Sequence, residues 1–139
     1  MMKKNGLSFM IELLIMLVIF IILINVSVVV YASARNTSQK ARHLSDAVIL
    51  ASNGAEVFIA SEDENEIIRI LNQNDNHKNN DALEFSYNDD LEPQADGRMV
   101  MKIDRTENDG FVHGKITIFY DNEVIYELET GRAQKGGRQ

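Results

Sequence analysis

The most continuous pattern in the chain is an apolar segment close to its N-terminus. Residues 13–24 carry no polar side chain, and the wider segment 7–30 is interrupted only by Ser8, Glu12, Asn25 and Ser27. A helix of 24 residues is about 36 Å long, which is enough to cross a hydrocarbon core of about 30 Å. The pattern therefore predicts a membrane-spanning helix over residues 7–31.

Apolar or small residues then recur at the spacing of an amphipathic helix. They are separated by three or four positions, at Ala41, Leu44, Val48, Ala51, Ala55 and Phe58. This spacing predicts that the helix continues through residues 32–60 and buries this stripe. Gly54 weakens a helix by about 1 kcal/mol and marks a candidate kink. The stripe suits a coiled coil, a membrane surface or a sheet; we favour a sheet, because the strands expected downstream need a cover.

A charged run, SEDENE, follows at residues 61–66 and either begins a new short helix or ends the long one. Ser61 is the expected N-cap of a short helix that includes residues 67–71, because a serine hydroxyl can accept from the first free backbone N–H groups. Residues 72–81 are rich in Asn and Asp and are expected to form a solvated loop. Residues 61–82 thus form a short helix and a polar loop.

From residue 83 the period of the hydrophobic pattern changes to two. Four runs alternate, with apolar members at Leu83, Phe85 and Tyr87; at Met99, Met101 and Ile103; at Ile116, Ile118 and Tyr120; and at Val124, Tyr126 and Leu128. Asp109-Gly110 and Asp121-Asn122 mark tight turns between runs. We predict a three- or four-stranded antiparallel sheet over residues 83–130, a flexible basic tail over 131–139, and an α+β fold in which the long helix covers the sheet.

Charge restricts the partners of the part that follows the apolar segment. Residues 36–139 carry 11 Lys/Arg and 20 Asp/Glu, a net charge of −9, within a chain whose total is −7. Such a balance makes a nucleic acid an unfavourable partner for this part. The absence of Cys excludes disulfides and cysteine-ligated zinc.

Catalytic and metal-binding patterns are weak. The sequence has no nucleophile motif, phosphate-binding loop or histidine pair at ligand spacing, so we expect neither an enzyme nor a cofactor. His43, His77 and His113 stand singly and are expected on the surface or in packing roles. Asp89, Asp90, Glu92 and Asp96 supply hard oxygen ligands that suit either calcium or a solvated acidic turn, without the spacing or the glycine of an EF-hand loop.

Glu12 is a carboxylate inside the apolar segment. A charge is costly there, so the default expectation is that this residue has a functional role. Together with the preceding residues it forms the string KKNGLSFMIELL at positions 3–14. This string resembles the class III leader of type IV prepilins and pseudopilins, which has a short basic leader, a glycine before the cut, and a hydrophobic helix bearing one early glutamate. The resemblance covers about the first 60 residues.

The resemblance implies a specific maturation of the N-terminus. Residues 1–6 are the leader, a membrane prepilin peptidase cuts after Gly6, and Leu7 becomes the N-methylated first residue. The leader faces the cytoplasm, and the C-terminal part faces outward. One position departs from the family pattern: the glutamate is usually fifth in the mature chain, whereas cutting after Gly6 makes Glu12 sixth. Placing Glu12 fifth would put Leu7 before the cut instead of a small residue.

The function implied is that of a structural subunit of a type IV pilus or of a pseudopilus resembling those of type II secretion. Its partners would be other pilin or pseudopilin subunits, the prepilin peptidase, and the membrane platform and assembly ATPase. In the filament Glu12 is expected to pair with the free amine of a neighbour's Leu7. The irregular glutamate position favours a minor subunit.

Two other functions remain open from the residues alone. The first is a single-pass membrane protein with a small external binding or sensor domain, which would keep residues 1–6. The second is a secreted protein released near Ala32-Ser33-Ala34, although its apolar segment is longer than the roughly 7–15 residues usual for a signal peptide. In the single-pass membrane protein, Glu12 would pair with a polar group of a partner helix. The alternative to any pairing role is that Glu12 extends its carboxylate to the membrane interface as a snorkelling residue.

Overall fold

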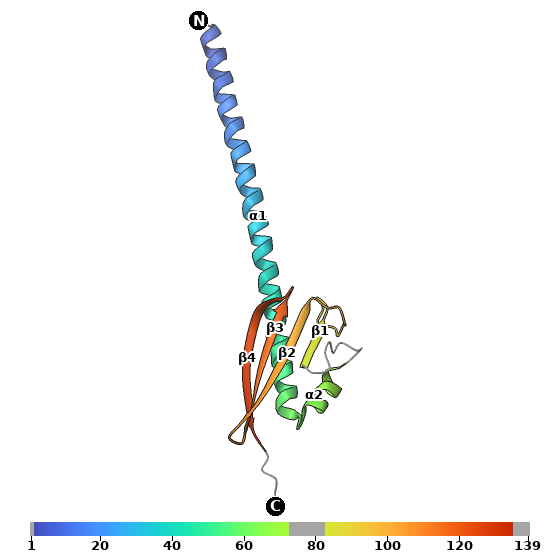
Figure 1. Ribbon diagram of the computed structural model, residues 1–139. Helices are drawn as coiled ribbons and strands as arrows, with labels where there is room; N and C mark the ends of the chain where they lie inside the picture. The colour runs from blue at the N-terminus through green and yellow to red at the C-terminus, as the bar shows by residue number, and fades with distance from the viewer. Residues whose placement is uncertain (1, 73–82, 135–139) are drawn as a thin grey trace, which may run out of the picture. The chain divides into compact units, whose positions relative to one another are not determined.

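A computed structural model of the protein describes residues 2–72 and 83–134 and contains both helices and strands (Figure 1). The helices are α1 (Met2–Ala60) and α2 (Glu64–Leu71), and the strands are β1 (Leu83–Tyr87), β2 (Met99–Asn108), β3 (Phe111–Tyr120) and β4 (Glu123–Ala133). The chain divides into two compact units, Met1–Ala41 and Arg42–Gln139. The predicted α+β class, with a long N-terminal helix packed on an antiparallel sheet, is confirmed.

The sheet is an antiparallel meander of four strands in the order β1-β2-β3-β4. Pairing of Asn108 with Phe111, and of Tyr120 with Glu123, leaves two-residue turns at the positions predicted from the sequence. Asp109, Gly110, Asp121 and Asn122 all have positive φ, between 47° and 79°. Turns of this handedness match the twist of the strands that they join, and Asp, Asn and Gly tolerate them best.

One strand departs from its predicted alternation. Ile118 is paired with Tyr126, whereas the next residue, Phe119, is paired with Val124, so that Ile125 is an extra residue in β4. This β-bulge moves Val124 onto the outer face of the sheet beside Phe119, and its side chain is 52% exposed. The expectation that Val124 lies on the buried face was therefore wrong. β4 also continues to Ala133, three residues beyond the predicted end of the sheet.

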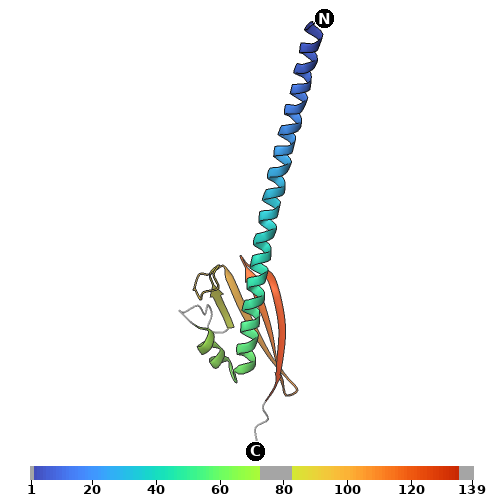
Figure 2. The same cartoon turned by 180° about the vertical axis from the view of Figure 1, so that it is seen from behind.

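The second half of α1, residues 42–60, covers one face of the sheet (Figure 2). Ala51, Ala55 and Phe58 are buried as predicted, but Leu44 and Val48 are 48% and 37% exposed. The buried line is completed instead by residues that the stripe omitted, namely Ala47, Leu50 and Gly54. Small side chains on this line let the helix approach the strands closely. Val48 lies on the flank of the line, whereas Leu44 lies on the line but precedes its first buried residue, Ala47.

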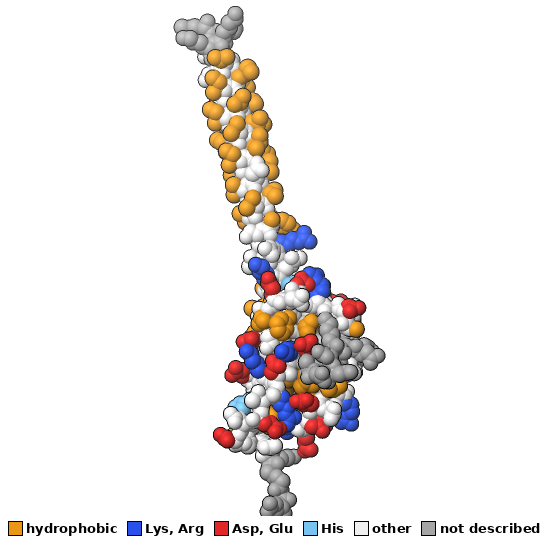
Figure 3. All heavy atoms as spheres, in the orientation of Figure 1, with side chains coloured by type: hydrophobic (Ala, Val, Ile, Leu, Met, Phe, Trp, Pro, Cys, Tyr) orange, Lys and Arg blue, Asp and Glu red, His pale blue; other side chains and the backbone are white. Residues whose placement is uncertain are grey.

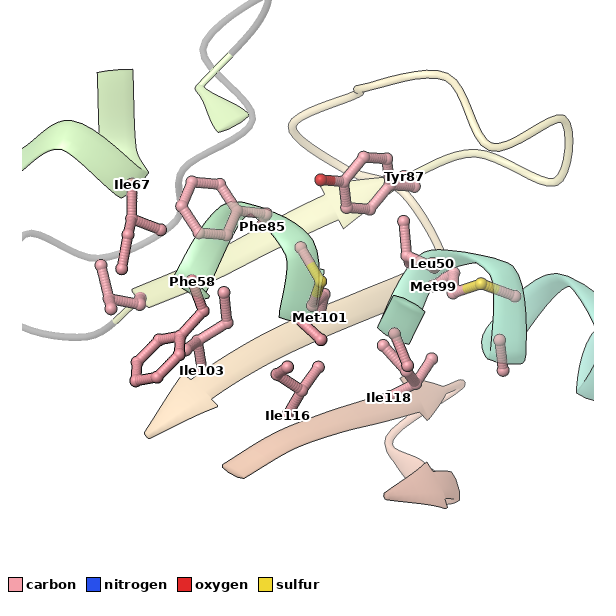
Figure 4. Packing of buried hydrophobic residues seen from close by; sticks show 14 of the residues in the cluster. Leu50, Phe58, Ile67, Phe85, Tyr87, Met99, Met101, Ile103, Ile116 and Ile118 are labelled. Atoms are coloured by element: carbon pink, nitrogen blue, oxygen red, sulfur yellow. The ribbon is translucent and has the colours of Figure 1, made fainter. Parts of the chain in front are cut away.

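The core between α1 and the sheet is formed by aliphatic, aromatic and methionine side chains (Figure 4). Phe58 from α1, Ile67 from α2 and Phe85 from β1 meet the methionines and isoleucines of the two central strands. The buried residues are Ala47, Leu50, Ala51, Ala55, Phe58, Ile67, Leu83, Phe85, Tyr87, Met99, Met101, Ile103, Val112, Ile116 and Ile118. All of them belong to the second unit, which therefore has a hydrophobic core of its own.

Two glycines permit the contact between helix and sheet. A Cβ added at Gly54 would lie 2.6 Å from the Met101 sulfur, and one added at Gly114 would lie 2.7 Å from the Phe58 ring. The helix continues through Gly54 to Ala60 without interruption. Gly54 thus marks a close approach of α1 to β2, and not a break in the helix.

The connection after α1 is held by arginines from the sheet. Arg105 of β2 and Arg132 of β4 both donate to the carbonyl oxygen of Glu62, at 3.5 and 2.8 Å. The N-cap of α2 is Asp63, whose carboxylate accepts from the backbone N–H of Glu66 at 2.8 Å. The expected cap, Ser61, is instead buried directly after α1, with its N–H donating to the Val57 carbonyl. The predicted polar loop lies almost wholly outside the described residues, as does most of the predicted tail beyond β4.

The contact between Gly114 and Phe58 predicts a stability difference between two glycines of the sheet. Gly114→Ala should lower the free energy of unfolding by about 1–3 kcal/mol, because the new methyl group must displace a fully buried ring. Gly131→Ala is the matched control, since its Cβ would find ordinary contacts at 3.4 Å and beyond. Urea unfolding of both variants measures this, and equal stabilities would contradict the close packing described.

Candidate functional site

The first candidate site is the N-terminal unit of α1. Its large hydrophobic side chains, from Leu7 to Tyr31, are each between 47% and 71% exposed. Figure 3 shows these side chains along the helix, in contrast with the mixed charges on the folded unit. By length and composition α1 is able to cross a membrane, although a signal sequence near an N-terminus meets the same test. An apolar surface of this extent is suited to lipid or to other helices and not to water.

Two polar side chains within this segment bond to the backbone of the helix itself. The Asn25 amide donates to the Ile21 carbonyl and the Ser27 hydroxyl to the Leu23 carbonyl, both at 2.8 Å. Bonding back to the residue four positions earlier leaves these groups with a partner even where water is absent. Asn25 and Ser27 are therefore compatible with an apolar environment around the helix.

Glu12 differs from these residues because it carries a charge. It is the only charged residue between Lys4 and Arg35, and it lies exposed on α1. The helix backbone offers Glu12 no hydrogen bond, because the N–H groups of the helix interior already donate to carbonyl oxygens of the preceding turn. A charged carboxylate among exposed apolar side chains is costly in an apolar environment unless a cation or a donor reaches it.

Gly6 has no packing role in the described structure. A Cβ added there would meet no atom within 4 Å, unlike those added at Gly54 and Gly114. Glycine inside a helix costs about 0.5–1 kcal/mol relative to alanine. The described fold therefore supplies no packing reason for glycine at this position.

The structure places Gly6, Leu7 and Glu12 on one helix. Leu7 and Glu12 are five residues apart, which corresponds to a rise of about 7.5 Å and a rotation of about 140° around the axis. The two residues therefore lie on different sides of the helix.

A second cluster, which sequence reasoning missed, joins the start of the folded unit to two turns. The His43 ring of α1 stacks on the Tyr120 ring of β3 with centroids 4.1 Å apart. Arg98 lies 5.0 Å from the centroid of the Tyr120 ring and donates through two nitrogens to the Asp121 carboxylate. The Tyr120 hydroxyl donates to Asp89 at 3.5 Å. The pairing of Met99 with Tyr120 explains this meeting of Arg98 and Asp121, and only a predicted register would have revealed it.

These contacts shift the acid–base equilibria of three groups. The hydrogen bond from Arg98 lowers the pKa of the Asp121 carboxyl, and the same pair raises the pKa of Arg98. The pKa of the Tyr120 phenol is raised, mainly by partial burial and to a smaller extent by the nearby charge of Asp89. The charges are exposed and partnered, which is typical of a structural clamp and not of a catalytic site.

The acidic turn is organised by backbone and amide contacts. The Asn88 side-chain oxygen accepts from the N–H groups of Asp90 and Glu92, and Leu91 adopts a positive φ of 62°. Asp89 faces Tyr120, whereas Asp90 lies 3.9 Å from Arg42, so the carboxylates turn to different partners. Within residues 2–72 and 83–134 no three His, Cys, Asp or Glu side chains converge in a group that would hold a metal ion. His113 lies beside Phe111, and His77 is outside the described residues.

Comparisons with known proteins found no match to any family model, curated protein or solved structure.

The Arg98–Asp121 pair predicts a pH dependence of stability. Because the pKa of Asp121 is lowered in the folded state, its stabilising contribution is present above pH about 4 and is lost as the pH falls through the lowered value. Replacing Arg98 with Met should therefore destabilise the protein more at pH about 7 than at pH about 2.5. Urea unfolding at both values measures the difference, and Asp121→Asn should show the same convergence. A deficit of Arg98→Met that is equal at both pH values would contradict it.

Proposed function

We propose that this protein is a subunit, minor in abundance, of a type IV pilus or of a pseudopilus resembling those of type II secretion. The observation that carries the proposal is the N-terminal unit of α1, which exposes apolar side chains from Leu7 to Tyr31 around a single carboxylate, Glu12. The resemblance of residues 3–14 to a class III prepilin leader supplies the chemistry. Before assembly the helix resides in the membrane with residues 1–6 on the cytoplasmic side.

Leader removal changes the charge at the start of the helix. Cutting the peptide bond after Gly6 converts the uncharged amide nitrogen of Leu7 into an α-amino group, which N-methylation leaves able to carry a proton. The absence of any packing requirement at Gly6 supports this step, since the peptidase needs a small residue beside the bond. The new cation is the counter-charge that Glu12 lacks within its own segment.

Assembly then brings the helix of one copy against those of its neighbours. An ion pair between Glu12 and a neighbour's Leu7 amine favours one axial offset, because any other offset leaves two charges unpaired in an apolar bundle. The rotation of about 140° between Leu7 and Glu12 supports pairing between copies. A glutamate in the usual fifth position would be rotated by about 40° around the helix axis from the first residue. Glu12, rotated by about 140° from Leu7, therefore lies on a different side of the helix.

The folded unit would be carried on the outside of such a filament. It has its own buried core and an acidic surface, and its charged clusters are engaged in structural contacts. The prepilin peptidase, the membrane platform, the assembly ATPase and other subunits would be its partners. No step of this proposal requires catalysis by this chain or a bound cofactor.

Processing should depend on Gly6. Gly6→Val should leave a full-length protein in the membrane, because a branched side chain does not fit beside the scissile bond of a peptidase site shaped for glycine. The helix tolerates the change, since the space around Gly6 is open. Immunoblots of cells with and without the prepilin peptidase measure cleavage.

Ser8→Val is the control for that variant, with the same side chain placed beyond the cleavage site. It should be processed as the wild type is. Cleavage of Gly6→Val at the wild-type rate would overturn the leader assignment. A wild-type protein that keeps residues 1–6 in its native host would favour the single-pass anchor with an external domain.

Glu12→Gln should separate processing from assembly. Leader cleavage and membrane insertion should continue, because the peptidase reads Gly6 and because a charge has been removed from the apolar helix. Incorporation into sheared filaments should fall strongly, since loss of one member of a buried ion pair costs about 3–5 kcal/mol.

The matched control is Glu56→Gln, the same change on the exposed face of α1 within the folded unit. It should enter filaments at the wild-type level. Cleaved Glu12→Gln present in filaments at that same level would exclude the pairing role and assign Glu12 to snorkelling at the membrane interface.

A further inference from the structure

The sheet ends in a long open edge at β4. In the described part of the chain β4 is paired only with β3 along its 11 residues, and it is the outermost strand in Figure 1. The opposite edge is shorter: β1 has five residues, and its end is bridged to Pro93 through Tyr87. An edge strand presents backbone N–H and C=O groups that another extended segment is able to pair with.

An apolar flank of α1 lies on the β4 side of the sheet. Leu50 faces the opposite side, where it lines a cavity of about 210 Å³ together with Ile70, Leu71 and Tyr87 of α2 and β1. Helix geometry places Val48 and Ile59 about 160–180° away from Leu50 around the axis. These two side chains are 37% and 50% exposed, so the flank that faces β4 is apolar and uncovered at both positions.

The two faces of β4 differ in chemistry. Tyr126 and Leu128 lie on the inner face, opposite the buried Ile118 and Ile116, and are only partly buried. Glu127 and Glu129 lie on the outer face and are exposed. Lys115 of β3, the cross-strand partner of Glu129, already lies 3.2 Å from the Glu127 carboxylate, so these three side chains leave one net negative charge on this part of the edge. A segment added beside β4 would therefore set alternate side chains against an apolar flank and against carboxylates.

We propose that the β4 edge accepts an extended segment of a partner protein as a fifth strand, and that this segment alternates apolar residues with Lys or Arg. Its apolar residues cover Tyr126 and Leu128 beneath the Val48–Ile59 flank. One of its basic residues pairs with Glu129, and another lies beside Glu127, which Lys115 of β3 also contacts. Backbone hydrogen bonds along the edge supply affinity, and the alternating side chains supply specificity.

A second copy of this chain is a poor occupant of the same edge. In antiparallel pairing of two β4 strands centred on Glu127, Leu128 or Glu129, a glutamate of one copy lies opposite a glutamate of the other. Like charges placed directly opposite across strands are destabilising. Charge complementarity thus selects a basic partner for this acidic edge. The inference concerns the folded unit alone and does not depend on leader cleavage or filament assembly.

The full chain in non-ionic detergent micelles allows a direct test. The probe is a blocked nine-residue peptide of alternating valine and lysine, labelled for fluorescence anisotropy, and the control peptide has the same composition with its lysines grouped at one end. Amide hydrogen exchange locates the bound peptide. We expect the alternating peptide to bind and to slow exchange in β4, and the grouped peptide to bind at least about tenfold more weakly.

Three variants relate the binding to the two faces. Glu129→Lys and Val48→Lys should each weaken binding about tenfold, the first by reversing a facing charge and the second by placing a cation on the apolar flank. Ile49→Lys is the control, because it places the same side chain about 100° around the axis from Val48 and about 160° from the buried Ala51. It should bind as the wild type does; circular dichroism checks that each variant is folded.

Three results would overturn the proposal. They are equal binding of the two peptides, exchange protection confined to elements other than β4, and no binding of the alternating peptide up to about 1 mM. Wild-type affinity of both Glu129→Lys and Val48→Lys would overturn it as well.

Discussion

The apolar surface of α1 between Leu7 and Tyr31 is the constraint on which the rest of the structure depends. Its large side chains are half or more exposed in nearly every case, and no described part of the chain covers them. Such a surface is stable in lipid or against other helices, where its polar residues Asn25 and Ser27 already have partners on the helix backbone. Glu12 is the one charged group in the segment, and an apolar environment would leave it without a counter-charge unless a partner supplied one.

In the folded unit, the last part of the same helix packs against the sheet. Residues 42–60 continue α1 but turn small side chains, Ala47, Ala51 and Gly54, toward the sheet, so that the methionines and isoleucines of β2 and β3 pack closely against the helix. Arginines from β2 and β4 then hold the Glu62 carbonyl just after the helix. One continuous helix thus carries an uncovered apolar segment and a segment that builds a core.

The architecture was predictable because its signals are local. Period-two alternation located all four strands, and Asp109-Gly110 and Asp121-Asn122 located two tight turns. The failures came from tertiary effects. Val124, Ile125 and Tyr126 are all apolar, so alternation alone cannot show that Ile125 is the bulged residue that moves Val124 outward.

The predictions of the buried stripe and of the helix cap were wrong in part, because tertiary packing decided both. The regular spacing of three and four positions selected Leu44 and Val48 and passed over Ala47 and Gly54, yet the short distance between helix and sheet places these small residues in the contact. Ser61 and Asp63 are both good caps, and Ser61 is buried at the end of α1, which leaves Asp63 to cap α2. The roles of Gly6, Leu7 and Glu12 involve other molecules, so they remain predictions from the leader-like string.

The most direct measurement is the intact mass and N-terminal sequence of the protein purified from the membranes or filaments of its native host. The account predicts a chain that begins at Leu7 and carries one additional methyl group on its α-amine. A chain that retains Met1, or one that begins close to Arg35, would contradict it.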